Sequence, residues 1–141
     1  MKGTKMNPVS INYLAVLLCG IISMVIGSVW YGPLFGKLWM KQYGFTEEDL
    51  KKDFNPAKTF GLAFVGHLVM ALVLAYLISL TNAQSITDGL RVSLSCWLGF
   101  TAATMFVNSL FSRTTLTLFF IDSGYQIVNS IVFGLILILW K

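Results

Sequence analysis

The chain has 141 residues, of which 56% are hydrophobic and 11% charged, and its formal net charge is +4. Soluble domains have about a quarter of their residues charged, so this composition excludes an ordinary soluble globular protein. The basic residues lie in loops and at the ends of apolar runs without forming a basic stripe or a reading motif, which argues against a nucleic-acid partner. We therefore expect a multi-pass protein of the cell membrane, with the lipid bilayer as its surroundings.

Four apolar runs are long enough to cross a bilayer. An α-helix needs about 20 mostly apolar residues to span the hydrocarbon core. Away from the ends of these runs, the only charged residue is Asp122. The predicted fold class is all-α: a polytopic bundle of four transmembrane helices that forms a single domain over residues 1–141. The predicted spans are about 9–31, 58–80, 89–111 and 116–140.

The first span carries Cys19, Ser23 and Gly27 four residues apart. Small residues at this spacing form a helix face that lets a neighbouring helix approach closely, so this face is predicted to point into the bundle. Neither Cys19 nor Cys96 has a CxxC or Cys/His spacing. Both cysteines are interpreted as packing residues, and no metal site or cofactor is expected.

Residues 32–57 form the one substantial loop. Aromatic rings cluster at membrane interfaces, and four such residues stand at the start of this loop: Trp30, Tyr31, Phe35 and Trp39. Further along, Thr46 is followed by three acidic residues and then by Lys51 and Lys52. This order predicts a short capped helix, because acids at its start and lysines at its end complement the helix dipole. The loop is expected to lie along the lipid headgroups.

The second span contains His67, the only histidine of the chain. At 1.5 Å per residue, His67 lies about 12 Å from the loop end of its helix. Ala71 and Ala75 continue the same small face. Two interpretations are open: a neutral imidazole hydrogen-bonded to a polar residue on a facing helix, or a group that handles protons or a ligand.

The third span has a stripe of small residues, Ser95, Gly99 and Ala103. In the fourth span the carboxylate of Asp122 is notable, because an ionisable group inside a membrane is costly and by default indicates function. Successive spans alternate in direction, so the polar residues of all spans gather in the half of the bundle nearest the 32–57 loop. We expect a pocket there, with Arg113 or Asn108 as the partner of Asp122. The pocket residues predicted are His67, Asn108, Arg113, Asp122, Gln126 and Asn129.

Basic residues set the expected orientation. The side of the 32–57 loop carries six of the ten, and the opposite side carries four, among them Lys2 and Lys5. Basic residues near span ends favour the cytoplasm, so this count favours a cytoplasmic loop side.

Several segments resemble a known family. The run Trp30-Tyr31-Gly32-Pro33-Leu34-Phe35-Gly36 is the most specific, and the segments 44–50, 107–111 and 118–125 agree with it. On these residues the chain resembles the bacterial family called domain of unknown function 1761, over nearly its whole length. The resemblance implies a small integral membrane protein with about four helices and carries no activity.

Three functions fit these observations. The first is a homo-oligomeric bundle whose polar pocket binds or passes an ion or small solute, since four helices alone fill their own centre. The second is a non-catalytic scaffold or accessory protein of the membrane. An enzyme acting on a lipid-like substrate ranks last, because no nucleophile–base pair, metal spacing or phosphate-binding loop is present in the sequence.

Overall fold

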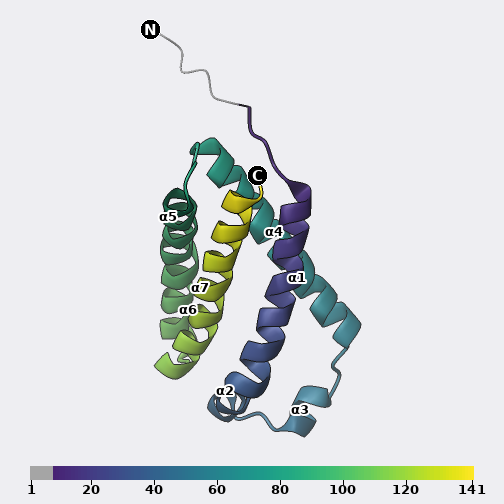
Figure 1. The fold of residues 1–141 in the computed structure, drawn as a ribbon. Helices are drawn as coiled ribbons and strands as arrows, with labels where there is room; N and C mark the ends of the chain where they lie inside the picture. Colours follow the sequence, from purple (N-terminus) through teal and green to yellow (C-terminus); the bar gives the residue numbers. More distant parts are fainter. Residues whose placement is uncertain (1–7) are drawn as a thin grey trace.

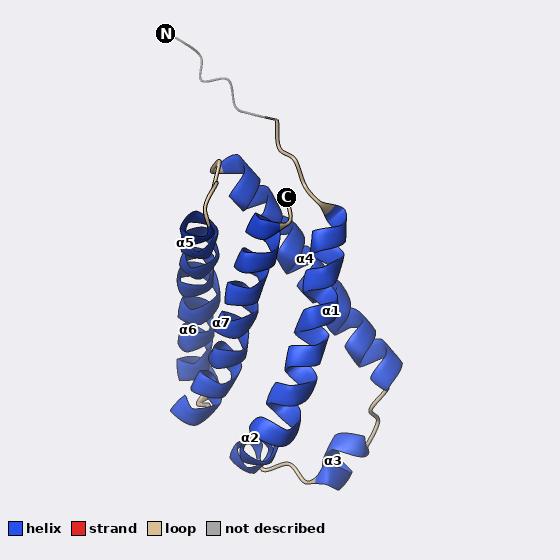
Figure 2. Cartoon of the chain, viewed as in Figure 1, coloured by secondary structure: helices blue, strands red, loops and turns tan. Residues whose placement is uncertain are grey.

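The computed structural model describes residues 8–141, which form helices joined by short loops and include no strand (Figures 1 and 2). Lys2 and Lys5 lie outside these residues. In chain order the elements are α1 (Tyr13–Val29), the π-helix η1 (Trp30–Leu34), α2 (Gly36–Tyr43), α3 (Glu47–Lys51), α4 (Pro56–Leu80), α5 (Ile86–Cys96), the π-helix η2 (Trp97–Ala102), α6 (Ala103–Ser112) and α7 (Leu116–Leu139).

Four continuous helices are long and apolar enough to cross a membrane, which confirms the predicted all-α fold. They are Tyr13–Leu34, Pro56–Leu80, Ile86–Ser112 and Leu116–Leu139. The first helix begins later than residue 9 because Asn12 caps it. Its side-chain oxygen accepts hydrogen bonds from the backbone N–H groups of Leu14 and Ala15, at 3.0 and 3.2 Å.

Polar caps also start the helices that follow the loop. Asn55 caps α4 by accepting from the backbone N–H of Lys58 at 3.0 Å, and Pro56 occupies the first helical position, where no N–H is needed. The predicted short helix is α3, opened by a capping box between Thr46 and Asp49. The hydrogen bond from the Thr46 hydroxyl holds the pKa of Asp49 below its usual value.

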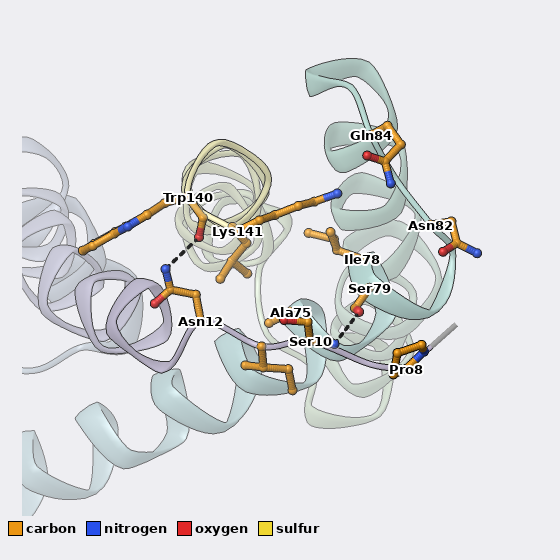
Figure 3. A pocket seen from close by; sticks show the side chains of 12 residues that line it. Pro8, Ser10, Asn12, Ala75, Ile78, Ser79, Asn82, Gln84, Trp140 and Lys141 are labelled. Atoms are coloured by element: carbon orange, nitrogen blue, oxygen red, sulfur yellow. Dashed lines mark hydrogen bonds between the residues drawn. The ribbon is translucent and has the colours of Figure 1, made fainter. Parts of the chain in front are cut away.

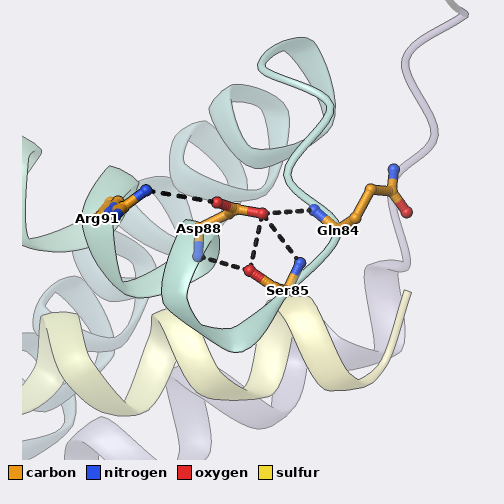
Figure 4. A network of polar contacts seen from close by, with 4 residues as sticks. All are labelled: Gln84, Ser85, Asp88 and Arg91. Carbon is orange, nitrogen blue, oxygen red and sulfur yellow. Dashed lines mark hydrogen bonds and ion pairs between the residues drawn. The ribbon is translucent and has the colours of Figure 1, made fainter.

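A second capping box opens α5. The Ser85 hydroxyl accepts from the backbone N–H of Asp88, and the Asp88 carboxylate accepts from the N–H groups of Gln84 and Ser85 (Figure 4). Arg91 lies 4.0 Å from the same carboxylate, one turn further along the helix. This cluster fixes where the third long helix begins.

The bundle is built around α7, which packs against α1, α2, α4, α5 and α6. Figure 1 shows the start of α1 and the end of α7 at one end of the bundle, here called the terminal end. The elements α2 and α3 lie at the opposite end, here called the loop end, where α7 begins. The predicted alternation of the four helices is therefore present.

Small side chains allow the helices to approach closely at the core. Cys19 on α1 and Ala71 on α4 are fully buried, next to Phe133 of α7. On the other flank, α5 lies so close to α7 that a Cβ at Gly134 would stand 2.5 Å from the hydroxyl of Ser93. The face of Cys19, Ser23 and Gly27 points into the bundle, as predicted from its spacing.

Each π-helix begins with a tryptophan that is hydrogen-bonded to α7. The indole N–H of Trp30 donates to the Ile121 carbonyl at 2.9 Å, and that of Trp97 donates to the Ser123 carbonyl at 3.2 Å. A π turn inserts one extra residue into a helix and so changes the direction of the side chains around it. Both flanking helices are thereby fixed to the loop half of α7.

At the terminal end, the first described residues and the last two residues of the chain line a small pocket of about 180 Å³ (Figure 3). The Asn12 side chain donates to the Trp140 carbonyl at 3.2 Å, and the backbone N–H of Ser10 donates to the Ser79 hydroxyl at 3.0 Å. The Lys141 ammonium donates to the Ala83 carbonyl. These contacts hold α1, α4 and α7 together at this end.

Candidate ligand-binding site

Asp122 lies on the second turn of α7 and faces α1. The hydroxyl of Tyr31 donates to the Asp122 carboxylate at 2.7 Å. Tyr31 and Trp30 are consecutive residues of η1, and they bond consecutive residues of α7, Asp122 and Ile121. The Asp122–Tyr31 bond therefore joins the first and last long helices near the loop end.

The prediction that Arg113 or Asn108 is the partner of Asp122 is wrong, because the carboxylate is bonded to Tyr31. Arg113 is exposed, ends α6 in a left-handed conformation with φ of 55°, and makes no ion pair with the described residues. Asn108 is exposed on α6 and does not bond Asp122 either. The physical reason is that the tight turn leaves Arg113 at the tip of the bundle, while Asp122 points toward α1.

The local sequence explains how Tyr31 reaches α7. Pro33 lacks a backbone N–H, and Gly32 takes the non-helical conformation φ −100°, ψ −105°, so the regular helix gives way to η1. Gly36 then starts α2, where its missing side chain leaves room for the Tyr31 carbonyl; a Cβ would stand 2.4 Å from that oxygen. The turned segment is also tied to α7 by the Thr115 hydroxyl, which donates to Gln42 at 2.8 Å.

His67 on α4 belongs to a second polar cluster, which lies about one turn further along α7 than Asp122. Its Nε2 lies 3.0 Å from the Tyr125 hydroxyl, and its Nδ1 lies 2.7 Å from the Ala63 carbonyl. The same Tyr125 hydroxyl is 3.0 Å from the Ser23 carbonyl of α1. His67 is thus hydrogen-bonded to a polar residue on a facing helix, while a role in handling protons or a ligand stays a prediction.

Two adjacent cavities lie beside these clusters. The larger, of about 500 Å³, is here called the aromatic cavity, and it is lined by five aromatic residues and one carboxylate: Tyr31, Trp39, Tyr43, Phe54, Phe60 and Asp122. The second, here called the inner cavity, measures about 410 Å³ and is lined by His67, Tyr125 and Gly27 among others. Tyr31 and Phe60 line both cavities, so they stand between the two spaces.

Two of the segments that form this site, residues 30–36 and 118–125, also carry the family resemblance. The family described as protein of unknown function (DUF1761) matches residues 14–138, which include η1 and nearly all of α7. The chain belongs to this family. No curated protein and no solved structure matches it. The DUF1761 match confirms the expected family and adds no activity to it.

In this DUF1761 protein, the predicted pocket residues divide into three groups. Asp122 lines the aromatic cavity and His67 the inner one. Asn108 and Arg113 lie outside both. Gln126 and Asn129 lie deeper on α7 and line neither cavity; Asn129 is fully buried.

The four aromatic residues predicted to lie at the interface have different positions. Trp30 and Tyr31 are bonded to α7, and the ring centroids of Trp30 and Phe35 are 4.7 Å apart. Trp39 lines the aromatic cavity and has its ring centroid 4.6 Å from that of Tyr43. Of the four predicted interfacial residues, Tyr31 and Trp39 line the aromatic cavity, and Trp30 and Phe35 do not.

The other aromatic residues of the site were not predicted from the sequence. Tyr125 stands three residues after Asp122, so an i, i+3 pairing on one helix face could have placed it beside the carboxylate. Phe54 and Phe60 come from the end of the loop and the start of α4, and only the folding of the loop brings them to Tyr31.

The wall of the aromatic cavity contains one carboxylate, and no basic side chain is among the described residues that line it. Asp122 is half-buried, and the ion pairs in the described part of the chain, Lys52–Asp49 and Arg91–Asp88, leave it without a basic partner. Burial, and then the nearby charge of Asp122, raise the pKa of the Tyr43 phenol. A positively charged group in this space would therefore be favoured.

Proposed function

We propose that this protein is a small integral membrane protein that binds a small solute or ion at the loop end of its bundle. The observation that carries the proposal is the Asp122 carboxylate, which lines a cavity of about 500 Å³ and has two neutral side chains, Tyr31 and Trp39, as its hydrogen-bond partners. A charged group in a membrane helix is costly, which favours a functional role for it.

The position of the cavity supports access from water. Its walls come from η1, α2, α3, the start of α4, the loop that precedes α4 and the first turns of α7, all at the loop end. Volumes of about 300–1,000 Å³ are typical of small-molecule sites, and the aromatic cavity falls in that range. A solute could enter here without crossing the apolar half of the bundle.

The test is the reactivity of a cysteine placed in the cavity. In a background of Cys19→Ala and Cys96→Ala, Thr59→Cys introduces a thiol in the wall of the aromatic cavity. Only the thiolate reacts, and it forms in water, so the protein in vesicles is expected to react with 2-hydroxyethyl methanethiosulfonate. Mass spectrometry measures the rate.

Val69→Cys is the matched control on the same helix, since Val69 is exposed near the middle of α4 and is expected to face lipid. Its thiol is expected to react at least about tenfold more slowly than that of Thr59→Cys, because lipid disfavours the thiolate. Equal, slow reaction at both positions would show that water does not reach the cavity and would overturn the proposed function.

We also propose that copies of the chain associate through the outer face of the third long helix. Ser95, Gly99 and Ala103 are exposed there, and a Cβ at Gly99 would meet no atom within 4 Å. Small residues on an open helix face let another helix approach closely.

A further inference from the structure

We propose that the aromatic cavity recognises an organic ammonium group, carried by either a free solute or a lipid headgroup. This inference rests on the proposed function, because it names the class of ligand for the same site. It follows from three properties of the cavity: its rings, its single charge and its size.

The rings supply the first argument. Five of the side chains that line the cavity are aromatic, and they come from four places in the chain: η1, α2, the end of the loop and α4. The face of an aromatic ring is electron-rich and attracts a cation within about 6 Å of the ring centroid. Aromatic walls with this composition are typical of sites for alkylated ammonium groups.

The charge of the cavity wall supplies the second argument. Asp122 is the one ionisable carboxylate in the wall, and no lysine, arginine or histidine is among the described residues that line the cavity. An anion would meet an unbalanced negative charge, and a neutral solute would leave that charge without a counter-ion. A cation both balances Asp122 and uses the ring faces.

Size and wall chemistry distinguish an organic cation from a metal ion. Hard metal ions such as Ca²⁺ require about six to eight oxygen ligands at short distance. The cavity offers the Asp122 carboxylate, the Thr59 hydroxyl and two phenols, together with the apolar side chains of Met40 and Leu50. A space of about 500 Å³ with such walls fits methyl or methylene groups around a nitrogen.

The experiment compares choline with its uncharged carbon isostere, 3,3-dimethylbutan-1-ol, by isothermal titration calorimetry. The full chain is purified in dodecyl maltoside, which has no ammonium group. Choline is expected to bind in a saturable way and at least about tenfold more tightly than the isostere, because only choline has cation–π and ionic attraction. Equal affinity for the two compounds would overturn the inference and leave the proposed function standing.

Two variants test whether side chains that line the aromatic cavity bind choline. Asp122→Asn keeps the shape of the side chain and is expected to weaken choline binding at least about tenfold while leaving the isostere unchanged. Trp39→Leu removes one ring and is expected to weaken choline binding, with partial recovery in Trp39→Phe. Asp88→Asn, which removes a carboxylate at the terminal end, is the matched control and should leave choline binding unchanged.

Absence of choline binding in detergent and in phosphatidylglycerol nanodiscs would overturn the inference. If Thr59→Cys still reacts in that case, the proposed function survives; if it does not react, both fail. A final comparison identifies the source of the ammonium group. Loss of choline binding in phosphatidylcholine nanodiscs, with binding retained in phosphatidylglycerol nanodiscs, supports a lipid headgroup, whereas equal binding in both supports a free solute.

Discussion

Tyr125 has one hydroxyl proton but faces two acceptors, the Ser23 carbonyl and Nε2 of His67, each at 3.0 Å. The Ala63 carbonyl can only accept, so Nδ1 of His67 carries a proton. With a neutral imidazole, the Tyr125 proton is shared between Nε2 and Ser23.

Asn129 differs from Tyr125, because its polar side-chain atoms lack well-placed partners. It is fully buried in the middle of α7, one turn from Tyr125, and among the described residues neither its amide nitrogen nor its oxygen makes a hydrogen bond of good geometry. The side-chain oxygen of Gln126 is also unpaired. A buried polar group without a partner costs about 1–3 kcal/mol of stability.

We therefore predict that Asn129→Leu stabilises the protein. The leucine keeps the branched shape and removes two unpaired polar atoms, so the free energy of unfolding in detergent is expected to rise by about 1–3 kcal/mol. Tyr125→Phe is the comparison, because it removes a hydroxyl that is bonded; its expected effect is a loss of about 0.6 kcal/mol or more. Destabilisation by Asn129→Leu would show that this amide is bonded after all.

At the scale of elements, the junction of η1 and α2 determines the site. The π turn directs Tyr31 and Trp30 to α7, and Gly36 allows α2 to start directly against the Tyr31 carbonyl. Because that neighbour is backbone, it cannot move aside as a flexible side chain would.

We predict that Gly36→Ala disrupts this junction. The added Cβ would lie 2.4 Å from the Tyr31 oxygen, so η1 or α2 must shift. Overpacking of this kind costs about 1–3 kcal/mol. Thermal unfolding in detergent measures the loss, and choline binding at the same site should weaken with it.

The matched control is Gly66→Ala on α4, where an added Cβ meets no atom within 4 Å. Alanine has a higher helix propensity than glycine by about 1 kcal/mol, so this variant should be unchanged or slightly more stable. Equal thermal stability of Gly36→Ala and Gly66→Ala would argue against the close contact at Gly36.

For the whole molecule, the four long helices differ in how far the chain itself covers them. The helix Leu116–Leu139 is the most buried, and Ile86–Ser112 is the least. The open face of the latter carries the small residues Ser95, Gly99 and Ala103. This difference favours a homo-oligomer in which a second copy covers that face.

We predict that Gly99→Leu lowers the oligomeric mass. A Cβ at this position meets no atom of its own chain within 4 Å, so the leucine is expected to leave the fold intact and to block close approach by another helix. Size-exclusion chromatography with light scattering, in detergent, measures the mass of the complex.

Gly66→Leu serves as the control, since Gly66 is equally open but lies on α4. A lower mass for Gly66→Leu and not for Gly99→Leu would place the interface on α4 and contradict this prediction. An unchanged mass for both would contradict association through small residues.

Some parts of the structure follow from local sequence and others do not. The helix cap at Thr46 was predicted, because a cap depends on residues three positions apart. The ends of the long helices were predicted to within a few residues from the lengths of the apolar runs. The partner of Asp122 was not predicted, because Tyr31 is 91 positions away in the chain.

The amino-acid sequence was sufficient to predict four long apolar helices, a first helix whose small residues face the core, and the place of Asp122 and His67 in the loop half. Composition and periodicity fix these properties because they belong to single helices. Only the tertiary structure decided that Asp122 faces Tyr31, that His67 faces Tyr125, and that five aromatic rings surround one cavity. Those outcomes depend on the rotation of one helix against another, which here is set by the π turns and the glycine contacts.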